Sequence, residues 1–189
     1  MPQDFSTKKI LILTANPRNT PALRLDEEVR EISMVLARAK NRELFDLKAL
    51  WGVRIQDIYQ ALLDYKPQIV HFSCHCEGES GLALEDETGN LQLAKTEALA
   101  KLFELFSDIE CIVLNACKSS VQAKAIVKHV QGVVWINKEI GDEAAIKFVT
   151  GFYNAIGAGE SFEFAYKLGC NVIQLEGIPE HLAPVMLRK

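Results

Sequence analysis

Two short segments of the sequence carry side chains that could act together in nucleophilic catalysis. One spans residues 71–78 and contains His75, and the other spans residues 115–120 and contains Cys117. A cysteine attacks a carbonyl carbon as its thiolate, and a nearby imidazole can take the thiol proton and later return it to a leaving amine. The residues after Cys117 are predicted to form a helix, whose free N–H groups favour a thiolate. The two segments therefore predict a Cys117–His75 catalytic pair.

The rest of the sequence indicates which elements hold these segments. Short apolar runs alternate with amphipathic stretches, in which apolar residues recur at spacings of three and four. We expect strands over residues 9–15, 45–51, 68–73, 110–114 and 133–137, a hairpin over 81–93, an edge strand near Val185, and helices over 25–39, 54–65, 96–106, 120–129, 143–156 and 161–168. This alternation predicts an α/β fold with a mainly parallel sheet that is covered by helices on both faces.

Both chemical segments lie at the end of a predicted core strand. Strand 68–73 leads into the segment with His75, and strand 110–114 leads into the segment with Cys117. In open α/β sheets, ligands bind outside the carboxyl ends of the strands. We therefore expect His75 and Cys117 to face each other across the rim of the sheet if the two strands are neighbours.

The composition narrows the classes of protein to which the chain can belong. Its 189 residues fit one domain, which we expect to span residues 1–189. A net charge of −4 and a pI near 5.6 give no electrostatic signature of nucleic-acid binding. We find no run long enough to cross a membrane, no secretory leader and no glycine-rich phosphate loop, so we expect no membrane or cofactor dependence. Five cysteines, an odd number, indicate a reducing cytoplasm.

Four motifs in sequence order resemble one known family. They are His71-Phe-Ser-x-His, Gly81-Leu-x-Leu-Glu-Asp, Val113-Leu-Asn-Ala-Cys-x-Ser and Ile140-Gly-Asp-Glu-Ala-Ala-Ile-Lys-Phe. Together they resemble the CHAT domain, a caspase-like family of clan CD cysteine peptidases that is similar to separase, over nearly the whole chain. The resemblance implies a three-layer α/β/α fold of the caspase-haemoglobinase type with a mainly parallel central sheet.

The same resemblance implies roles for individual residues. It predicts a cytosolic cysteine endopeptidase with His75 and Cys117 as its dyad, acting on protein or peptide substrates. The backbone N–H groups of Cys117 and Cys76, with Gly78 as a further donor, are then expected to meet the oxyanion. Domains of this family usually sit beside sensor or repeat domains, so we expect such partners in the same chain or encoded nearby.

The chain departs from the family pattern around the histidine. That pattern resembles Ser-Gly-His-Gly, whereas here Cys74 and Cys76 take the places of both glycines. A side chain at residue 76 restricts the backbone and is expected to crowd the cleft. The alternative interpretation is therefore a catalytically impaired pseudopeptidase that serves as a protein-interaction module.

Asp142 is a candidate specificity residue, because it follows the strand over 133–137 at the same rim. The segment resembles the separase stretch in which an aspartate holds the P1 arginine, which implies that Asp142 lines an S1 pocket and selects a basic P1 residue. An aspartate in a partly dry pocket can accept a bidentate guanidinium. The alternative is that Asp142 is only the N-cap of the helix predicted from Glu143.

The remaining cysteines and histidines allow other interpretations. Cys74 and Cys76, if exposed, could form a strained disulfide that switches off a peptidase. The soft ligands between His71 and Cys76 come from six consecutive residues, which is poor geometry for tetrahedral zinc, so we expect no metal site. We expect His71 to fill a core position, and Cys111 and Cys170 to be packing residues.

Overall fold

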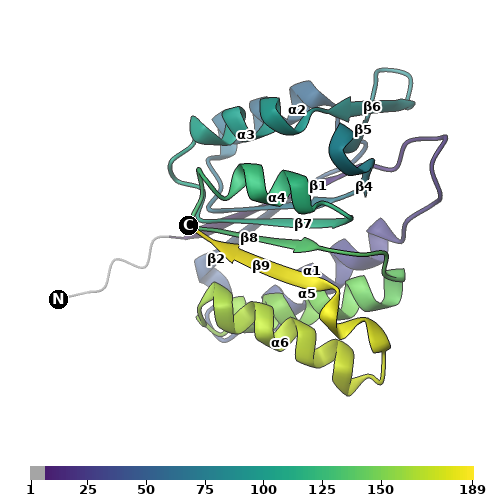
Figure 1. Ribbon diagram of the computed structural model, residues 1–189. Helices are drawn as coiled ribbons and strands as arrows, with labels where there is room; N and C mark the ends of the chain where they lie inside the picture. The colour runs from purple at the N-terminus through teal and green to yellow at the C-terminus, as the bar shows by residue number, and fades with distance from the viewer. Residues whose placement is uncertain (1–6) are drawn as a thin grey trace.

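The computed structural model describes residues 7–189, and its centre is a six-stranded sheet (Figure 1). The strands lie in the order β2 (Phe45–Leu50), β1 (Lys8–Thr14), β3 (Ile69–Ser73), β7 (Cys111–Cys117), β8 (Gly132–Ile136) and β9 (Pro184–Arg188). Neighbouring strands are parallel from β2 to β8, and β9 joins the edge antiparallel to β8. The predicted mainly parallel sheet and its final edge strand are therefore confirmed.

Helices cover both faces of this sheet and make the fold a three-layer α/β/α arrangement (Figure 1). One layer contains α1 (Leu25–Arg38), α5 (Asp142–Gly157) and α6 (Phe162–Leu175). The other layer contains α2 (Ile55–Tyr65), α3 (Thr96–Glu104) and α4 (Ser120–Ile126). Short 3₁₀ turns, η1 (Arg42–Leu44), η2 (Gly78–Ser80) and η3 (Pro179–Leu182), complete the connections. No helix within residues 7–189 is both long and apolar enough to cross a membrane.

The two apolar cores follow from the alternation of side chains along the strands, because successive residues point to opposite faces. Ile69 of β3 and Val113 of β7 pack with the layer of α1, α5 and α6. Phe72 of β3 and Leu114 of β7 pack with the layer of α2, α3 and α4. All four side chains are buried, so both faces of the middle strands stabilise the fold.

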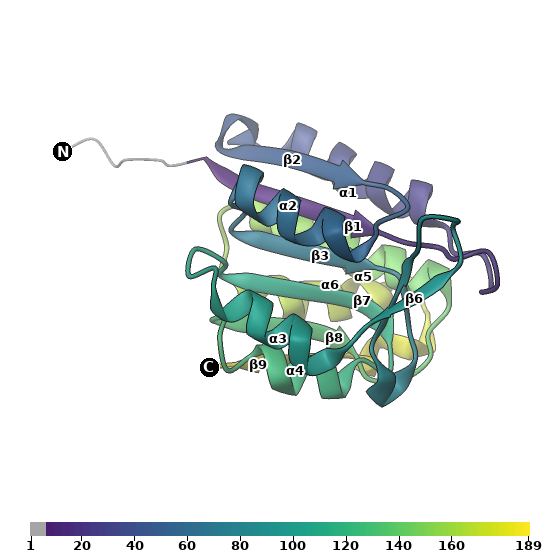
Figure 2. The same ribbon diagram turned by 90° about the horizontal axis from the view of Figure 1, so that it is seen from above.

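A second, three-stranded sheet stands at the end toward which the parallel strands point (Figure 2). It consists of β4 (His75–Cys76), β5 (Leu82–Glu85) and β6 (Leu91–Ala94), all antiparallel. Strands β5 and β6 confirm the predicted hairpin, whereas β4 has only two residues and leaves no periodic signal in the sequence. Gly81 starts the hairpin at a φ of 135°, and a Cβ there would lie 2.2 Å from the carbonyl oxygen of Ala94. Only glycine fits this close approach of two strands.

Helix α6 is longer than the sequence predicts. The prediction ends this helix at Leu168, before Gly169, whereas the helix continues to Leu175. A Cβ at Gly169 would lie 2.7 Å from the Phe148 ring of α5. Gly169 is therefore not a helix end. It lies where α5 and α6 pack closely, and glycine is tolerated inside the helix because it allows that contact.

Candidate active site

The two predicted reactive side chains lie at the same edge of the molecule. Strands β3 and β7 are parallel neighbours, with Ser73 opposite Asn115 as the last pair of their ladder. His75 follows two residues after Ser73, and Cys117 follows two residues after Asn115. Both line a single cavity of about 50 Å³. The structure therefore brings His75 and Cys117 together at the carboxyl edge, as the strand ends predict.

A backbone carbonyl fixes the orientation of His75. Its Nε2 lies 2.8 Å from the oxygen of Pro21, in the loop between β1 and α1. A carbonyl oxygen can only accept, so Nε2 carries the hydrogen and donates it to Pro21. In the neutral imidazole the lone pair is then on Nδ1, which is the nitrogen left to act as a base. The sequence gives no sign of this partner, because any residue at position 21 offers the same carbonyl group.

Cys117 sits where the regular sheet ends. The pairing of β7 with β8 shifts register between Leu114 and Cys117, and the Cys117 side chain is half-buried. Lys118 then takes a left-handed conformation with a φ of 61°, which turns the chain toward α4. A non-glycine residue in this region is uncommon and marks a conformation held by its surroundings. The turn thus presents Cys117 at the rim and sends the next residues away from it.

Cys76 and Gly78, the other predicted backbone contributors, do not line the cavity. The Cys76 thiol instead faces Gln122 of α4, with its Sγ 3.5 Å from Oε1 of Gln122 and 3.5 Å from the Gly78 oxygen. Burial raises the pKa of the Cys76 thiol to about 11, so at neutral pH it stays protonated. Gly78 has a φ of 55°, a backbone that glycine adopts most readily.

Cys74 is buried, which contradicts the idea of an exposed Cys74–Cys76 pair. Its side chain is 2% exposed and packs in the core on the side of α2, α3 and α4. Burial also raises the pKa of its thiol far above the ordinary range. All five cysteines are free. Within residues 7–189, no group of three His, Cys, Asp or Glu side chains is placed to hold a metal ion.

Asp142 lines the same cavity as His75 and Cys117, and it is half-buried there. The alternative that it caps the helix is wrong, because Gly141 is the N-cap of α5 and Asp142 is the first residue of the helix proper. A carboxylate in the first turn still interacts favourably with the helix dipole. Asp142 therefore places a negative charge on the cavity wall.

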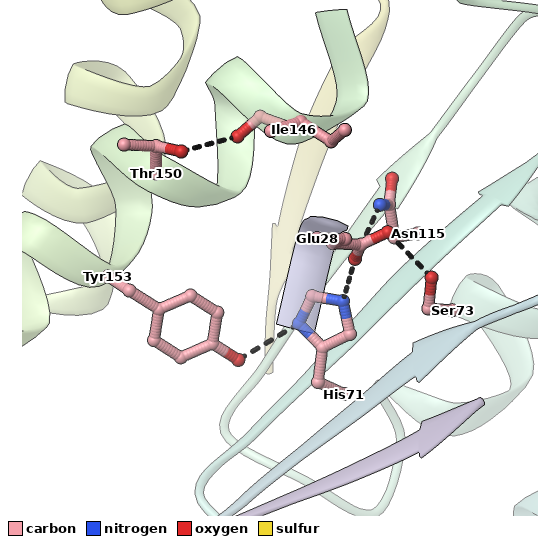
Figure 3. Close-up of polar contacts among 7 residues, drawn as sticks. All are labelled: Glu28, His71, Ser73, Asn115, Ile146, Thr150 and Tyr153. Carbon is pink, nitrogen blue, oxygen red and sulfur yellow. Dashed lines mark hydrogen bonds and ion pairs between the residues drawn. The ribbon is translucent and has the colours of Figure 1, made fainter. Parts of the chain in front are cut away.

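A buried polar cluster, which the sequence did not predict, adjoins the cavity, and its members Glu28, Ser73 and Asn115 contribute to the cavity lining (Figure 3). Glu28 of α1 accepts three hydrogen bonds: from His71 Nε2 at 2.8 Å, from Asn115 Nδ2 at 2.8 Å and from Ser73 Oγ at 2.6 Å. His71 Nδ1 lies 2.9 Å from the hydroxyl of Tyr153 on α5. We call these five residues the Glu28 cluster. The prediction that His71 fills a core position is confirmed, since its side chain is fully buried.

The arrangement of layers and strands is that of caspase-like clan CD peptidases. Among solved structures, the chain is similar to a secreted C11 cysteine protease from Bacteroides thetaiotaomicron in complex with an irreversible peptide inhibitor. The TM-score is 0.70 at 11% identity, over 97% of this chain and 66% of that one. The predicted caspase-haemoglobinase-like fold is therefore confirmed.

The family follows from the sequence comparison. The model of the CHAT domain matches residues 2–165, so the chain belongs to the CHAT domain family, as its motifs predicted. It is 25% identical over 176 residues to a "Probable protease" of Gillisia limnaea, covering 90% of this chain and 31% of that protein. It is 24% identical over 181 residues to a "Roc-COR-CHAT protease" of an unknown prokaryotic organism, covering 92% of this chain and 17% of that protein. The chain thus spans less than a third of either relative.

Proposed function

We propose that this chain is a cysteine endopeptidase that acts on protein or peptide substrates, with Cys117 as the nucleophile and His75 as the general acid and base. The observation that carries the proposal is that both side chains line one cavity at the carboxyl edge of the sheet. The hydrogen bond from His75 to Pro21 supports it, because it leaves Nδ1 available to the thiol proton. Membership of a family with protease-named relatives agrees with this chemistry.

Acylation begins with transfer of the Cys117 proton to Nδ1 of His75. The thiolate then attacks the scissile carbonyl carbon, and a C–S bond forms while the carbonyl oxygen becomes an oxyanion. The backbone N–H group of Cys117, a residue that lines the cavity, stabilises that charge, whereas Cys76 and Gly78, the other expected donors, lie outside the cavity lining. When the oxyanion collapses, the C–N bond breaks and the imidazolium gives its proton to the leaving amine, so a thioester and a free amine result.

Hydrolysis of the thioester repeats these steps with water. His75 removes a proton from the water molecule, whose oxygen attacks the thioester carbon. The C–S bond then breaks, and the proton on His75 returns to the sulfur of Cys117, which releases the carboxylic acid. The Pro21 carbonyl serves throughout by holding the imidazole through Nε2 and stabilising the imidazolium form.

Specificity for a basic residue at P1 is the finer part of the proposal. Asp142 offers a carboxylate on the cavity wall close to the nucleophile. A guanidinium or ammonium group placed there pairs with it, whereas a neutral or acidic P1 side chain leaves the carboxylate without a partner.

We further propose one domain over residues 1–189 that acts in the cytoplasm, since all five cysteines are unpaired. Sensor domains fused or encoded nearby fit the Roc-COR-CHAT name of one relative.

The decisive experiment combines peptide cleavage with an activity-based probe. An acyloxymethyl ketone with arginine at P1 should label the protein at Cys117 at neutral pH, as mapped by mass spectrometry. Cys117→Ala should lower cleavage of a peptide library by about 10³-fold or more, because it removes the nucleophile. Its melting temperature should remain near that of the parent, since the side chain is small and half-buried.

Cys76 provides the internal control for that probe. Its pKa of about 11 keeps the thiolate scarce at neutral pH, so labelling there reports background reactivity. Labelling of Cys117 no faster than that of Cys76, together with absence of cleavage, would refute the endopeptidase.

The second candidate is an interaction module without catalytic activity. The replacement of both family glycines by Cys74 and Cys76 is the observation that favours it. If it is correct, Cys117→Ala should leave partner binding unchanged and no peptide should be cleaved. The substitution Cys76→Gly separates the two candidates further. If the parent cleaves no peptide and Cys76→Gly does, the chain is a pseudopeptidase that this cysteine inactivates.

A further inference from the structure

The Glu28 cluster connects four elements of the fold through hydrogen bonds. Glu28 comes from α1, His71 and Ser73 come from β3, Asn115 comes from β7, and Tyr153 comes from α5 (Figure 3). The exposed fraction of each side chain is small, from 0% for His71 to 9% for Asn115. A buried polar network of this kind is costly unless every member is hydrogen-bonded, and here each member has a partner.

The protons in the cluster can be assigned from its hydrogen bonds. Within residues 7–189, the Tyr153 hydroxyl contacts one polar atom, Nδ1 of His71, and it is fully buried. Its hydrogen must be donated to that nitrogen, so the hydrogen of the imidazole is on Nε2. Nε2 then donates to Glu28, as do the amide of Asn115 and the hydroxyl of Ser73. The two oxygens of the Glu28 carboxyl group thus face all three donors.

The carboxyl group of Glu28 bridges the ends of the two strands. Oε2 accepts from Ser73 on β3, whereas Oε1 accepts from Asn115 on β7 as well as from His71. Ser73 and Asn115 are opposite each other in the register, and they form the last pair of the β3–β7 ladder. Beyond this pair the strands are no longer held by the ladder, and His75 and Cys117 both follow two residues later.

We propose that Glu28 is a positioning residue, which clamps the final β3–β7 pair and thereby sets the spacing of His75 and Cys117. The proposal rests on the function proposed above, because it needs these two residues to work as a pair. Glu28 lines the same cavity as both residues, but its hydrogen bonds go to His71, Ser73 and Asn115, so in this role it acts through the strand ends. A displacement of about 1 Å between reacting groups can cost about 10²-fold in rate, so loosening this pair should lower turnover far more than substrate binding.

The test compares Glu28→Ala with Glu28→Gln. Glutamine keeps an oxygen for His71 and Asn115, and its NH₂ can donate to the Ser73 hydroxyl, so the clamp survives without its charge. We expect Glu28→Ala to lower kcat about 10²-fold with KM changed less than about threefold. Glu28→Gln should remain within about threefold of the parent. Iodoacetamide alkylation of Cys117 at pH 7, followed by mass spectrometry, should slow about 10-fold in Glu28→Ala and not in Glu28→Gln.

Tyr153→Phe is the matched control, since it removes a hydrogen bond of the same buried cluster that involves neither Ser73 nor Asn115. Its kcat and alkylation rate should equal those of the parent, although its melting temperature should fall. Equal losses in Tyr153→Phe and Glu28→Ala would overturn the proposal, because they would indicate general loosening of the core. Equal losses in Glu28→Gln and Glu28→Ala would overturn it too, since they would indicate that charge matters and spacing does not.

Two further variants keep the proposal testable if Glu28→Ala does not fold. Ser73→Ala and Asn115→Ala each remove one side of the clamp and should each slow alkylation of Cys117, and parental rates in both would overturn the proposal. Alkylation also separates this proposal from the proposed function. Slower alkylation in a protein that cleaves no peptide supports the clamp and refutes the endopeptidase. If the parent cleaves peptides and Glu28→Ala is alkylated at Cys117 at the parental rate, the endopeptidase is supported and the clamp is refuted.

Discussion

On the face covered by α2, α3 and α4, strands β3 and β7 are apolar through Phe72, Leu114 and Ala116, and Cys74, which follows β3, is buried on the same face. On the face covered by α1 and α5, the same strands begin with apolar residues and become polar toward the carboxyl edge, through His71, Ser73 and Asn115. His75 and Cys117 follow the polar set at the same spacing of two. One face of these strands therefore stabilises the fold by burying apolar side chains. The other face forms directed hydrogen bonds near the strand ends, where the reactive groups must be aligned.

Phe72→Ala is expected to give the largest effect, and it tests the apolar face. The ring is fully buried and packs edge-on against Phe103, with centroids 6.2 Å apart. Its removal leaves a cavity and should lower the free energy of unfolding by about 3–5 kcal/mol, measured by urea titration. The kcat of the remaining folded enzyme should change little. A loss of kcat larger than that of Glu28→Ala would mean that the two faces do not divide their roles in this way.

Asp142→Asn should have an intermediate effect, and it tests the charge on the polar side. Asparagine keeps the shape of the side chain and removes its charge. We expect kcat/KM for a peptide with arginine at P1 to fall about 10- to 100-fold, while a matched peptide with a neutral P1 residue changes little. The measurement is a P1 scan on parent and variant with otherwise identical peptides. A parent that already prefers an apolar or acidic P1 residue would remove Asp142 from the specificity pocket.

Cys76→Ala should give the smallest effect, and it tests whether the second thiol near the site is buried. Its pKa is about 11, above the ordinary value of 9.0, because burial favours the neutral thiol. The fold therefore favours the protonated form, whose contribution to stability is complete below about pH 9 and is lost as the pH rises toward about 11. The free energy of unfolding should fall more steeply over this range in the parent than in Cys76→Ala. Identical slopes would show that Cys76 is not buried as described.

The sequence predicts the strands, the layers and the reactive pair because each leaves a local signal. Apolar runs mark the strands of the core, and a histidine and a cysteine at two strand ends, His75 and Cys117, indicate nucleophilic catalysis. Glu28 leaves a weaker signal. It lies one residue before Val29 on the buried face of α1, yet an acid in the first turn is fully explained by the helix dipole. The contact of His75 with Pro21 leaves no signal at all, because a backbone carbonyl has no residue type.

The position of β4 has a mechanical consequence. Cys117 ends a strand of the six-stranded sheet, whereas His75 belongs to the three-stranded sheet, and Cys74 is the one residue between β3 and β4. The nucleophile and its base thus belong to two different sheets, which are joined along the chain by a single residue. The two sheets share one apolar core, because Leu82 and Leu84 of the small sheet pack in the same cluster as Phe72 and Leu114 of the large one. A load on the β5–β6 hairpin is therefore transmitted to His75 through its pairing with Ala83, and to the strand of Cys117 through the shared core.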